Sequence, residues 1–372
     1  MKYLVFTNTP AHVHLYRNAV TELRAAGHDV LVLARDYGCT VDLLEWYDLP
    51  YSVYGRCGTS KYSLVRNLPG QYARIFRTVL SYEPDLVFGM GGYAAHAGAV
   101  SRSKTILLLD SEPTGLDHLV STPFAHAVLT PAAFRKDLGS DHYVFDGFKE
   151  SAYLHPETFT PNPSVRDRLG VGDDRYVVVR FNAFGSHHDV GEHGFGPAER
   201  RRLLDRLADH ATVLVSDEGG DLDLDSLPAE PFDVHPALMH DALAEAALLV
   251  ADTQTIVTEA ALLGTPTIRS NSFVGKSDMG NFVELGERGL VRNVRSLPEV
   301  LAAAEELLTT DGTAETWRRR RDEYLAEMVN LTDLILAVAE APDALDSIGS
   351  LRRRSGTEDS DGVVADPVST QS

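Results

Sequence analysis

The feature of this chain that most limits its fold is a regular alternation of short apolar runs with longer segments of helical period. The apolar runs are rich in branched side chains, and stretches such as Ile106–Leu109 and Tyr176–Val179 contain no charged residue. Continuous apolar strands are typical of parallel sheets that helices cover on both faces. The alternation therefore predicts repeated βαβ units, an α/β fold with doubly wound parallel sheets.

Ten strands are expected at the apolar runs: Tyr3–Thr7, Asp29–Leu33, Leu86–Gly89, Thr105–Leu109, Ala127–Thr130, Tyr143–Phe145, Tyr176–Arg180, Thr212–Ser216, Leu248–Ala251 and Thr267–Arg269. The repetition breaks once, at Phe148–Pro163, where three prolines and no regular period indicate a linker. We therefore predict two Rossmann-like domains, at 1–150 and 164–312. A long helix at Glu315–Ala341 is expected to close the fold, with 313–341 as a separate C-terminal helical segment and 355–372 as a disordered acidic tail.

The composition excludes several classes of function. The chain of 372 residues has 54 acidic and 34 basic residues, a formal net charge of −20. Nucleic-acid binding needs basic patches, so we expect no nucleic-acid partner. No run of 18 or more apolar residues occurs, so no stable membrane span is expected either.

The same charges predict where the protein works. Only six of the 34 basic residues are Lys, and an acidic, lysine-poor surface is typical of adaptation to high salt, which indicates a halophilic archaeon. At molar salt the Debye length is about 3 Å, so the self-repulsion of this surface would be screened. The opening MKYLVFTNTP is expected to be a strand rather than a signal peptide, and the two cysteines have no metal-ligand or disulfide spacing. A cytoplasmic location follows as an expectation.

Polar residues follow several predicted strands, where open α/β sheets bind their ligands. His12 and His14 come at the start of the first helix and can act as a base or hydrogen-bond a sugar, or they can be packing residues. Gly91 and Gly92 follow the strand that ends at Gly89 and would let a ligand approach the backbone, although a plain tight turn has the same pattern. These glycines do not complete the dinucleotide-binding fingerprint, which disfavours NAD.

Carboxylates and a cation follow two further strands. Asp110 and Glu112 can transfer protons or bind hydroxyls, or Asp110 can cap a helix, and we favour a functional role for Glu112. Arg180 ends a buried strand, where an unpaired cation is costly, so it is expected to meet an anion such as a diphosphate or a carboxylate. The neighbouring His187 and His188 form a polar cluster on a glycine-containing loop.

The strongest local signal is the segment from Asp252 to Glu259. A strand ends there, and a helix begins with hydroxyl side chains at Thr253 and Thr255. The positive end of a helix favours a diphosphate, and Glu259 lies about one turn inside, where a carboxylate can hold both ribose hydroxyls. Helix capping alone gives the same pattern. No metal-ligand spacing is evident, so no metal site is predicted.

Three segments resemble GT-B enzymes in matching order. TPAHVHLYRNAVTEL with GHDV, and PDLVFGMGGY, are similar to the opening and the second glycine loop of the N-acetylglucosaminyl transferase of peptidoglycan synthesis. DTQTIVTEAALLGTPTI resembles the nucleotide-binding helix of that transferase and of the UDP-N-acetylglucosamine 2-epimerases. The resemblance implies two domains that face a cleft. It also implies that Glu259 is the ribose-binding carboxylate and that His12 is the histidine of the first loop.

Up to about residue 340, the chain most resembles an archaeal family known as domain of unknown function 354. The match rests on TPAHVH, LLLDSEP, FKESAYLHPE, SHHD and EAALLGTP in order, and it implies no particular reaction. The chain departs from the two enzymes in its first turn, where Thr9-Pro10-Ala11 replaces the transferase's glycines. Thr253-Gln254-Thr255 likewise replaces the epimerases' Ser-Gly-Gly and leaves less room for phosphate.

Three functions remain open from the sequence. The leading hypothesis is a metal-independent glycosyltransferase that uses a UDP-sugar as substrate, needs no cofactor and transfers to an unknown acceptor, with His12 or Glu112 as base. The second is an epimerase-like isomerase that uses Glu112, Glu218 and His187 or His188. The third is a non-catalytic nucleotide-sugar binding protein. The first two make the protein an enzyme.

Overall fold

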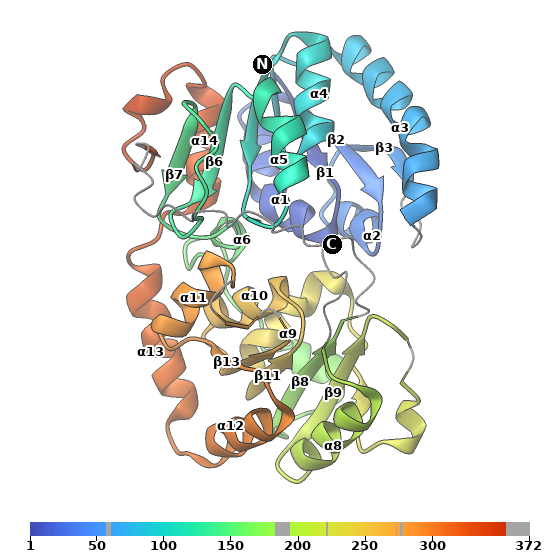
Figure 1. Cartoon of the computed structure of the whole chain (residues 1–372), viewed down its shortest axis with the longest axis vertical. Helices are drawn as coiled ribbons and strands as arrows, with labels where there is room; N and C mark the ends of the chain where they lie inside the picture. Colours follow the sequence, from blue (N-terminus) through green and yellow to red (C-terminus); the bar gives the residue numbers. More distant parts are fainter. Residues whose placement is uncertain (57–60, 183–193, 221, 273, 276–277, 355–372) are drawn as a thin grey trace, which may run out of the picture.

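A computed structural model describes residues 1–56, 61–182, 194–220, 222–272, 274–275 and 278–354, with the side chains of 61–65 left out. Two α/β domains lie one above the other (Figure 1). Each of the ten predicted strands overlaps an observed strand. Four observed strands were not predicted, because none is a continuous apolar run: Tyr51–Arg56, Glu230–Pro231, Arg292–Val294 and Arg352–Arg353.

The first domain is built on an eight-stranded sheet with the order β14-β7-β6-β5-β4-β1-β2-β3. Its strands are β1 (Lys2–Thr7), β2 (Asp29–Asp36), β3 (Tyr51–Arg56), β4 (Leu86–Gly89), β5 (Lys104–Leu108), β6 (Ala127–Pro131), β7 (His142–Phe145) and β14 (Arg352–Arg353). All neighbours pair in parallel except β14, which is antiparallel to β7. The helices are α1 (Pro10–Ala25), α2 (Thr40–Trp46), α3 (Lys61–Tyr82), α4 (Gly92–Ser101) and α5 (Gly115–Ser121), followed by the 3-10 turn η1 (Thr122–Phe124).

The second domain is built on a six-stranded, fully parallel sheet with the order β10-β9-β8-β11-β12-β13. Its strands are β8 (Tyr176–Phe181), β9 (Thr212–Asp217), β10 (Glu230–Pro231), β11 (Leu248–Ala251), β12 (Thr267–Ser270) and β13 (Arg292–Val294). Its helices are α7 (Val165–Leu169), α8 (Pro197–Ala208), α9 (Met239–Glu245), α10 (Thr255–Leu263), α11 (Gly280–Glu287), α12 (Leu297–Thr309) and α13 (Thr313–Leu325), with 3-10 turns η2 (Leu224–Ser226) and η3 (Pro236–Leu238).

The chain crosses between the domains twice. The first crossing is the predicted linker, which contains the short helix α6 (Ser151–Leu154). The second lies between α13, which ends at Leu325, and α14 (Leu331–Glu340). The prediction of one continuous helix at Glu315–Ala341 is therefore wrong, because the chain leaves the helix between these two residues. Asn330 begins α14 by accepting a hydrogen bond from the amide of Thr332. Helix α14 then packs against α1 and α6, and η4 (Leu345–Ser347) leads to β14 in the first sheet.

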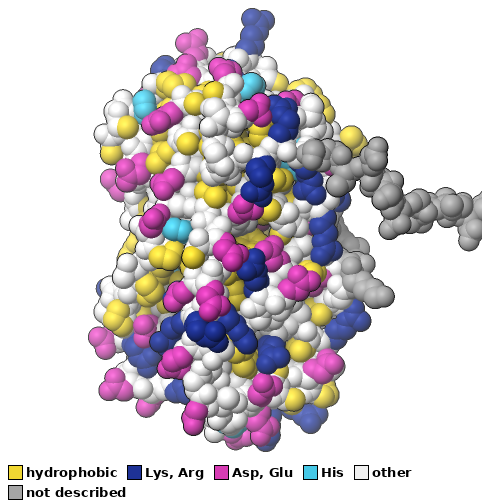
Figure 2. All heavy atoms as spheres, turned by 90° about the vertical axis from the view of Figure 1, so that its left-hand side faces the viewer, with side chains coloured by type: hydrophobic (Ala, Val, Ile, Leu, Met, Phe, Trp, Pro, Cys, Tyr) yellow, Lys and Arg dark blue, Asp and Glu magenta, His cyan; other side chains and the backbone are white. Residues whose placement is uncertain are grey.

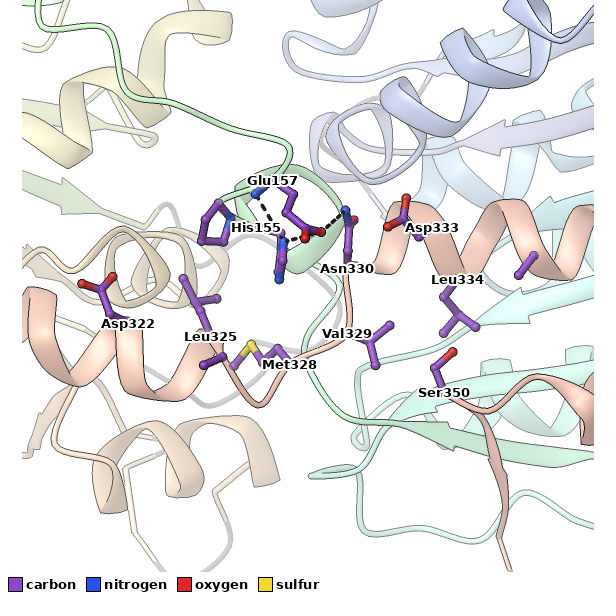
Figure 3. Close-up of a pocket in the computed structure, with 13 residues that line it drawn as sticks. His155, Glu157, Asp322, Leu325, Met328, Val329, Asn330, Asp333, Leu334 and Ser350 are labelled. Atoms are coloured by element: carbon purple, nitrogen blue, oxygen red, sulfur yellow. Dashed lines mark hydrogen bonds and ion pairs between the residues drawn. The ribbon is translucent and has the colours of Figure 1, made fainter.

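The two crossings border a groove on one face of the molecule (Figure 3). His155 and Glu157 of the linker lie on one side of it, and Glu157 Oε2 accepts a hydrogen bond from Asn330 Nδ2 at 3.4 Å. Asp and Glu side chains are spread over this face, with Lys and Arg between them (Figure 2). Within the described part of the chain, no helix combines the length and the apolar character that crossing a membrane requires.

The carboxyl ends of the two sheets face each other. The loop after β5 reaches the start of α11, where the Gly280 amide donates to Glu112 Oε1 at 3.2 Å. On α2, Trp46 stacks on His235 of the other domain with ring centroids 4.1 Å apart. These contacts bring the loops that follow the strands of both domains into one interface, where open α/β sheets bind ligands.

Candidate functional site

A group of buried and half-buried ionisable side chains lies where the first turn of α1, the loop after β5, the linker and the α9–α10 region meet. We call it the interface cluster. Its members are His12, Asp110, Lys149, Glu150, Tyr153, His240 and Glu259. The sequence singled out three of them, namely His12, Asp110 and Glu259. Such a concentration of buried titratable groups at the ligand-binding edge of two sheets marks a candidate active site.

Lys149 is the cation at the centre of the cluster. Its Nζ lies 2.5 Å from Asp110 Oδ2 and 3.6 Å from Glu150 Oε1. Burial alone would lower the pKa of Lys149, but the charges of the two carboxylates raise it above the usual value, so Lys149 carries its charge. Lys149 and Glu150 are the KE of the FKESAYLHPE segment, and they were missed because that segment was interpreted as a linker.

Glu150 is a buried carboxyl with an unusual proton affinity. Its residue is 4% exposed, and burial raises the pKa of the Glu150 carboxyl to about 7, against the opposing charge of Lys149. The nearby carboxylates Asp110 and Glu259 contribute to this increase in the pKa of Glu150. A carboxyl that exchanges its proton near neutral pH is suited to acid–base chemistry.

Glu259 is held by two partners from different segments. Its Oε1 accepts a hydrogen bond from the Tyr153 hydroxyl at 2.8 Å and lies 3.1 Å from His240 Nε2. Burial would raise the pKa of Glu259, but His240 and the two hydrogen bonds lower it below the usual value. The carboxylate predicted to bind ribose is thus ionised and 5% exposed, with one oxygen already engaged.

His12 is half-buried and points its Nδ1 at the backbone, where it accepts a hydrogen bond from the Asn8 amide at 3.2 Å. Burial lowers the pKa of His12 to about 3, with Lys149 adding to the effect. The ring is therefore neutral, and its remaining proton is on Nε2. In this state His12 is a hydrogen-bond donor and a weak base, which favours the sugar-binding role over the base role expected from the sequence.

His14 lies inside the packing between the domains. Its ring contacts those of Tyr153 and His240, with centroids 5.3 Å and 4.6 Å away, and it is 6% exposed. Arg17 Nη1 is 3.3 Å from His14 Nδ1. Burial lowers the pKa of His14 well below its usual value. Of the two alternatives that the sequence offered for His14, a functional role or a packing role, its position in the structure favours packing.

The glycine turn after β4 is filled by a side chain of the protein itself. Gly91 has φ of 82°, and the Gly92 amide donates to Asp117 Oδ1 at 3.2 Å. Glycine is required at Gly91 by its positive φ, and a Cβ there would also displace the Asp117 carboxylate, whose Oδ2 lies 2.5 Å from that position. The ligand contact predicted for Gly91 and Gly92 would have to displace Asp117.

Glu112 and Arg180 also have partners within the protein. Glu112 Oε1 accepts hydrogen bonds from the amides of Gly280 and Arg135, at 3.2 Å and 3.3 Å. Arg180 donates to Ser216 Oγ at 2.8 Å and forms an ion pair with Glu218. The anion that Arg180 was expected to meet is thus Glu218 in this structure. His187 and His188 lie outside the described residues.

The start of α10 has an unsatisfied polar group. Thr253 is 8% exposed, and its Oγ1 is buried without a hydrogen-bond partner among the described residues. No side chain in that part of the chain caps the helix at Gln254, and Thr255 is its first residue. Asp252, just before, holds the preceding loops through the amides of Asn182 and Phe195, at 2.7 Å and 3.3 Å. An uncapped helix start beside a free hydroxyl suits an anion such as a diphosphate.

No protein-family model and no curated protein matches the sequence. Solved structures, in contrast, share the whole architecture. The UDP-GlcNAc 2-epimerase from Neisseria meningitidis, solved with UDP-GlcNAc bound, has a TM-score of 0.62 at 12% identity, over 91% of this chain and 100% of its own. MurG from Acinetobacter baumannii has a TM-score of 0.55 at 16% identity, over 91% and 99%.

A third structure, HepE from Anabaena in complex with UDP-glucose, has a TM-score of 0.58 at 16% identity, over 92% of this chain and 100% of its own. The fold is of the GT-B type. This confirms the predicted fold class of two parallel-sheet α/β domains. At these identities the likeness to GT-B proteins concerns the fold alone, and membership of the archaeal family stays a prediction.

Proposed function

We propose that this GT-B protein is an enzyme that acts on a nucleotide-sugar, and specifically a glycosyltransferase that uses a UDP-sugar. The observation that carries the proposal is the start of α10, where the buried Thr253 hydroxyl has no partner in the described structure and no side chain described there caps the helix. Glu259 follows one turn later. Structural neighbours solved with UDP-GlcNAc or UDP-glucose support the choice of uridine nucleotide.

In this proposal, the diphosphate lies at the start of α10. The helix dipole and the hydroxyls of Thr253 and Thr255 would stabilise the charge that develops on UDP as the sugar leaves. We expect this helix end, rather than a metal ion, to offset the charge. For Glu259 to hold the ribose, the hydroxyls must either use its second oxygen or replace the Tyr153 bond.

The acceptor would approach from the first domain. His12 lies at the ligand-binding edge of that sheet and presents Nε2–H as a donor, so it would orient a hydroxyl rather than deprotonate it. Glu112 is the alternative base from the sequence, and its Oε1 accepts hydrogen bonds from two backbone amides. Both residues would keep a role in the site without being strong bases.

The first test is calorimetric titration of UDP into the protein in molar KCl. We expect micromolar binding in the wild type and roughly 10- to 150-fold weaker binding in Thr253→Val, because a hydrogen bond to a charged group is worth about 1.5–3 kcal/mol. Glu259→Gln should weaken binding similarly, whereas Glu305→Gln, an exposed carboxylate on α12, is the control and should bind normally. No heat with UDP, or equal binding in all variants, would refute the nucleotide site.

An epimerase is the second candidate, and Glu112 together with two carboxylates of the interface cluster, Asp110 and Glu150, favours it. Removal and return of a proton at sugar C2 needs acid–base groups on both faces of the ring, and Asp110, Glu112 and Glu150 come from two loops. Deuterium incorporation at C2 of a UDP-sugar in D2O would support the epimerase. UDP release that depends on an acceptor, without deuterium uptake, would support the transferase.

We also propose that the protein works at high salt, in the cytoplasm of a salt-loving archaeon. The net charge of −20 and the low lysine content support this proposal.

A further inference from the structure

One buried residue after β1 ties together four other segments of the first domain. Asn8 is 8% exposed, and each of its four polar groups has a partner. Its Oδ1 accepts a hydrogen bond from the Tyr54 hydroxyl at 2.8 Å, and its Nδ2 donates to the Met90 carbonyl at 3.4 Å. Its amide donates to His12 Nδ1 at 3.2 Å, and its carbonyl accepts from Arg35 Nε at 3.1 Å. A buried residue that is bonded on every side holds its partners in fixed orientations.

Arg35 lies at an irregular place in the sheet. The register of β2 against β3 shifts between Ala34 and Arg35, so that Tyr54 is an additional residue in β3. Irregularities of this kind turn side chains in new directions and are common next to active sites. Here Tyr54 and Arg35 both reach Asn8 from neighbouring strands. Arg35 is thereby anchored beside the first turn of α1, at the ligand-binding edge of the sheet.

His12 and Arg35 each keep donors without a partner among the described residues. With Nδ1 occupied, the neutral ring of His12 carries its proton on Nε2. Burial is the main cause of its lowered pKa, and the charges of Lys149 and Arg35 contribute, so the guanidinium lies near the ring. Arg35 uses Nε for Asn8 and lies 5.5 Å from the centre of the Tyr37 ring, and no carboxylate in the described part of the chain pairs with it. Both side chains are half-buried and can be reached from solvent.

Other cations near this edge already have anionic partners. The pairs are Arg56 with Asp36, Lys149 with Asp110, and Arg180 with Glu218. The first pair is important for Arg35, because it engages the carboxylate that follows Arg35 in the sequence. A half-buried guanidinium without a counter-ion is suited to a carboxylate or a phosphate, which its parallel N–H groups can bind through two hydrogen bonds.

We propose that Arg35 binds an anionic group of the acceptor, a carboxylate or a phosphate, while His12 Nε2–H donates to one of the acceptor's hydroxyls. This inference rests on the proposed transferase function, and it names the class of acceptor as a hydroxyl compound with a negative charge. Asn8 anchors both donors through its own backbone, so the fold sets the distance between the bound anion and the bound hydroxyl. A neutral acceptor would leave the guanidinium without its partner.

The test is calorimetric titration of three methyl glycosides into protein saturated with UDP in molar KCl. The glycosides differ only at C6, which carries a hydroxyl, a carboxylate or a phosphate, so the two charged arms distinguish the two kinds of anion. We expect the wild type to bind at least one charged glycoside roughly 10- to 150-fold more tightly than the neutral one, the gain from a charge-assisted hydrogen bond. This preference should disappear in Arg35→Gln.

Two further variants and one measurement serve as controls. Arg35→Lys keeps the charge but not the fork of donors, so it should keep part of the preference. Arg56→Gln removes a side chain that is 85% exposed and paired with Asp36, and it should match the wild type. Unchanged UDP binding in Arg35→Gln shows that this variant is folded.

The outcomes separate the anion site from the proposed function. A wild type that does not bind UDP refutes the proposed function, and a preference that depends on Arg35 without nucleotide then leaves an anion site with no role in transfer. In UDP-loaded wild type, equal binding of the three glycosides, or binding of none, overturns the anion site while nucleotide binding stands. A preference that persists in Arg35→Gln overturns the role of Arg35. Loss of UDP binding in Arg35→Gln alone would assign Arg35 to the diphosphate and overturn its assignment to the acceptor.

Discussion

At the scale of single residues, the fold holds several imidazoles in the neutral form. His142 of β7 is fully buried, with Nε2 2.8 Å from Thr130 Oγ1 and Nδ1 accepting from the Leu138 amide at 3.1 Å. Burial lowers the pKa of His142 to about 4, and Arg354 adds to the effect. A second proton on this ring would break the bond from Leu138, so the acid form is disfavoured in the folded state.

The pH dependence of stability follows from this shift. An unfolded chain takes up the proton near pH 6.5, and folded His142 does so near pH 4, so its contribution is present above pH 6.5 and lost as the pH falls toward 4. The full effect is roughly 3 kcal/mol. We expect His142→Gln to lose much less stability than the wild type between pH 7 and pH 5 in urea unfolding.

The control for this experiment is His210→Gln, at a half-buried turn, which should keep the slope of the wild type. Parallel pH profiles of the His142→Gln variant and the wild type would contradict the assignment.

Some residues of the candidate site could be predicted from the sequence, and others could not. Thr253 and Glu259 were predicted because a strand followed by hydroxyl side chains and a helix is a local pattern. The partners of Glu259 were not, because Tyr153 is 106 positions away and becomes a neighbour through the packing of α6 on α10. Lys149 and Glu150 lie in a segment without periodicity, so their burial depends on both domains.

At the scale of elements, the contact between α11 and the first domain controls how closely the two domains approach. Gly280 is the first residue of α11, and a Cβ built there would lie 1.9 Å from the backbone oxygen of Ala133. Glycine is therefore required for close backbone approach, not for an unusual φ. Ala133 and the neighbouring Asn281 lie beside Lys149 and Glu150 of the interface cluster.

We predict that Gly280→Ala separates the domains at this point. Because the clash is with backbone, the neighbour cannot rotate away, and we expect a larger radius of gyration in solution scattering. UDP release should fall while UDP binding at α10 is largely kept. Gly70→Ala is the control, since a Cβ there meets nothing within 4 Å. An unchanged radius of gyration in Gly280→Ala would show that the interface is not closed in solution.

Strands and helices differed in how well the sequence predicted them. The ten apolar strands were confirmed because burial on both faces leaves a continuous pattern. The break between α13 and α14 was missed because Ala326–Asn330 contains neither glycine nor proline. It is set instead by a distant contact, the hydrogen bond of 2.8 Å from the Val329 amide to the Asp146 carbonyl.

At the scale of the whole molecule, charge is the dominant feature. A net charge of −20 opposes the compact state through self-repulsion. Ion pairs on the surface, such as Arg352 with Asp146 and Arg288 with Glu327, offset little of it, because exposed pairs contribute about 0–1 kcal/mol each. Screening by salt acts on all the charges together.

We predict that the melting temperature rises as KCl increases from about 0.1 M to molar concentration, as the Debye length falls from about 10 Å to about 3 Å. Thermal unfolding in a KCl series measures this effect, and sucrose at matched osmolality is the control for exclusion of solute. A melting temperature that falls with KCl, or that rises equally in sucrose, would contradict adaptation to high salt.

The return of the chain to its first domain has a consequence for synthesis. The sheet that begins with β1 receives its edge strand β14, and α1 receives its neighbour α14, from residues beyond 330. On the ribosome, the domain that emerges first is therefore the one completed last. Until residues 331–353 have left the ribosome, the edge of β7 and one face of α1 are uncovered. During that time they are exposed to pairing with other chains, a state that chaperones typically protect.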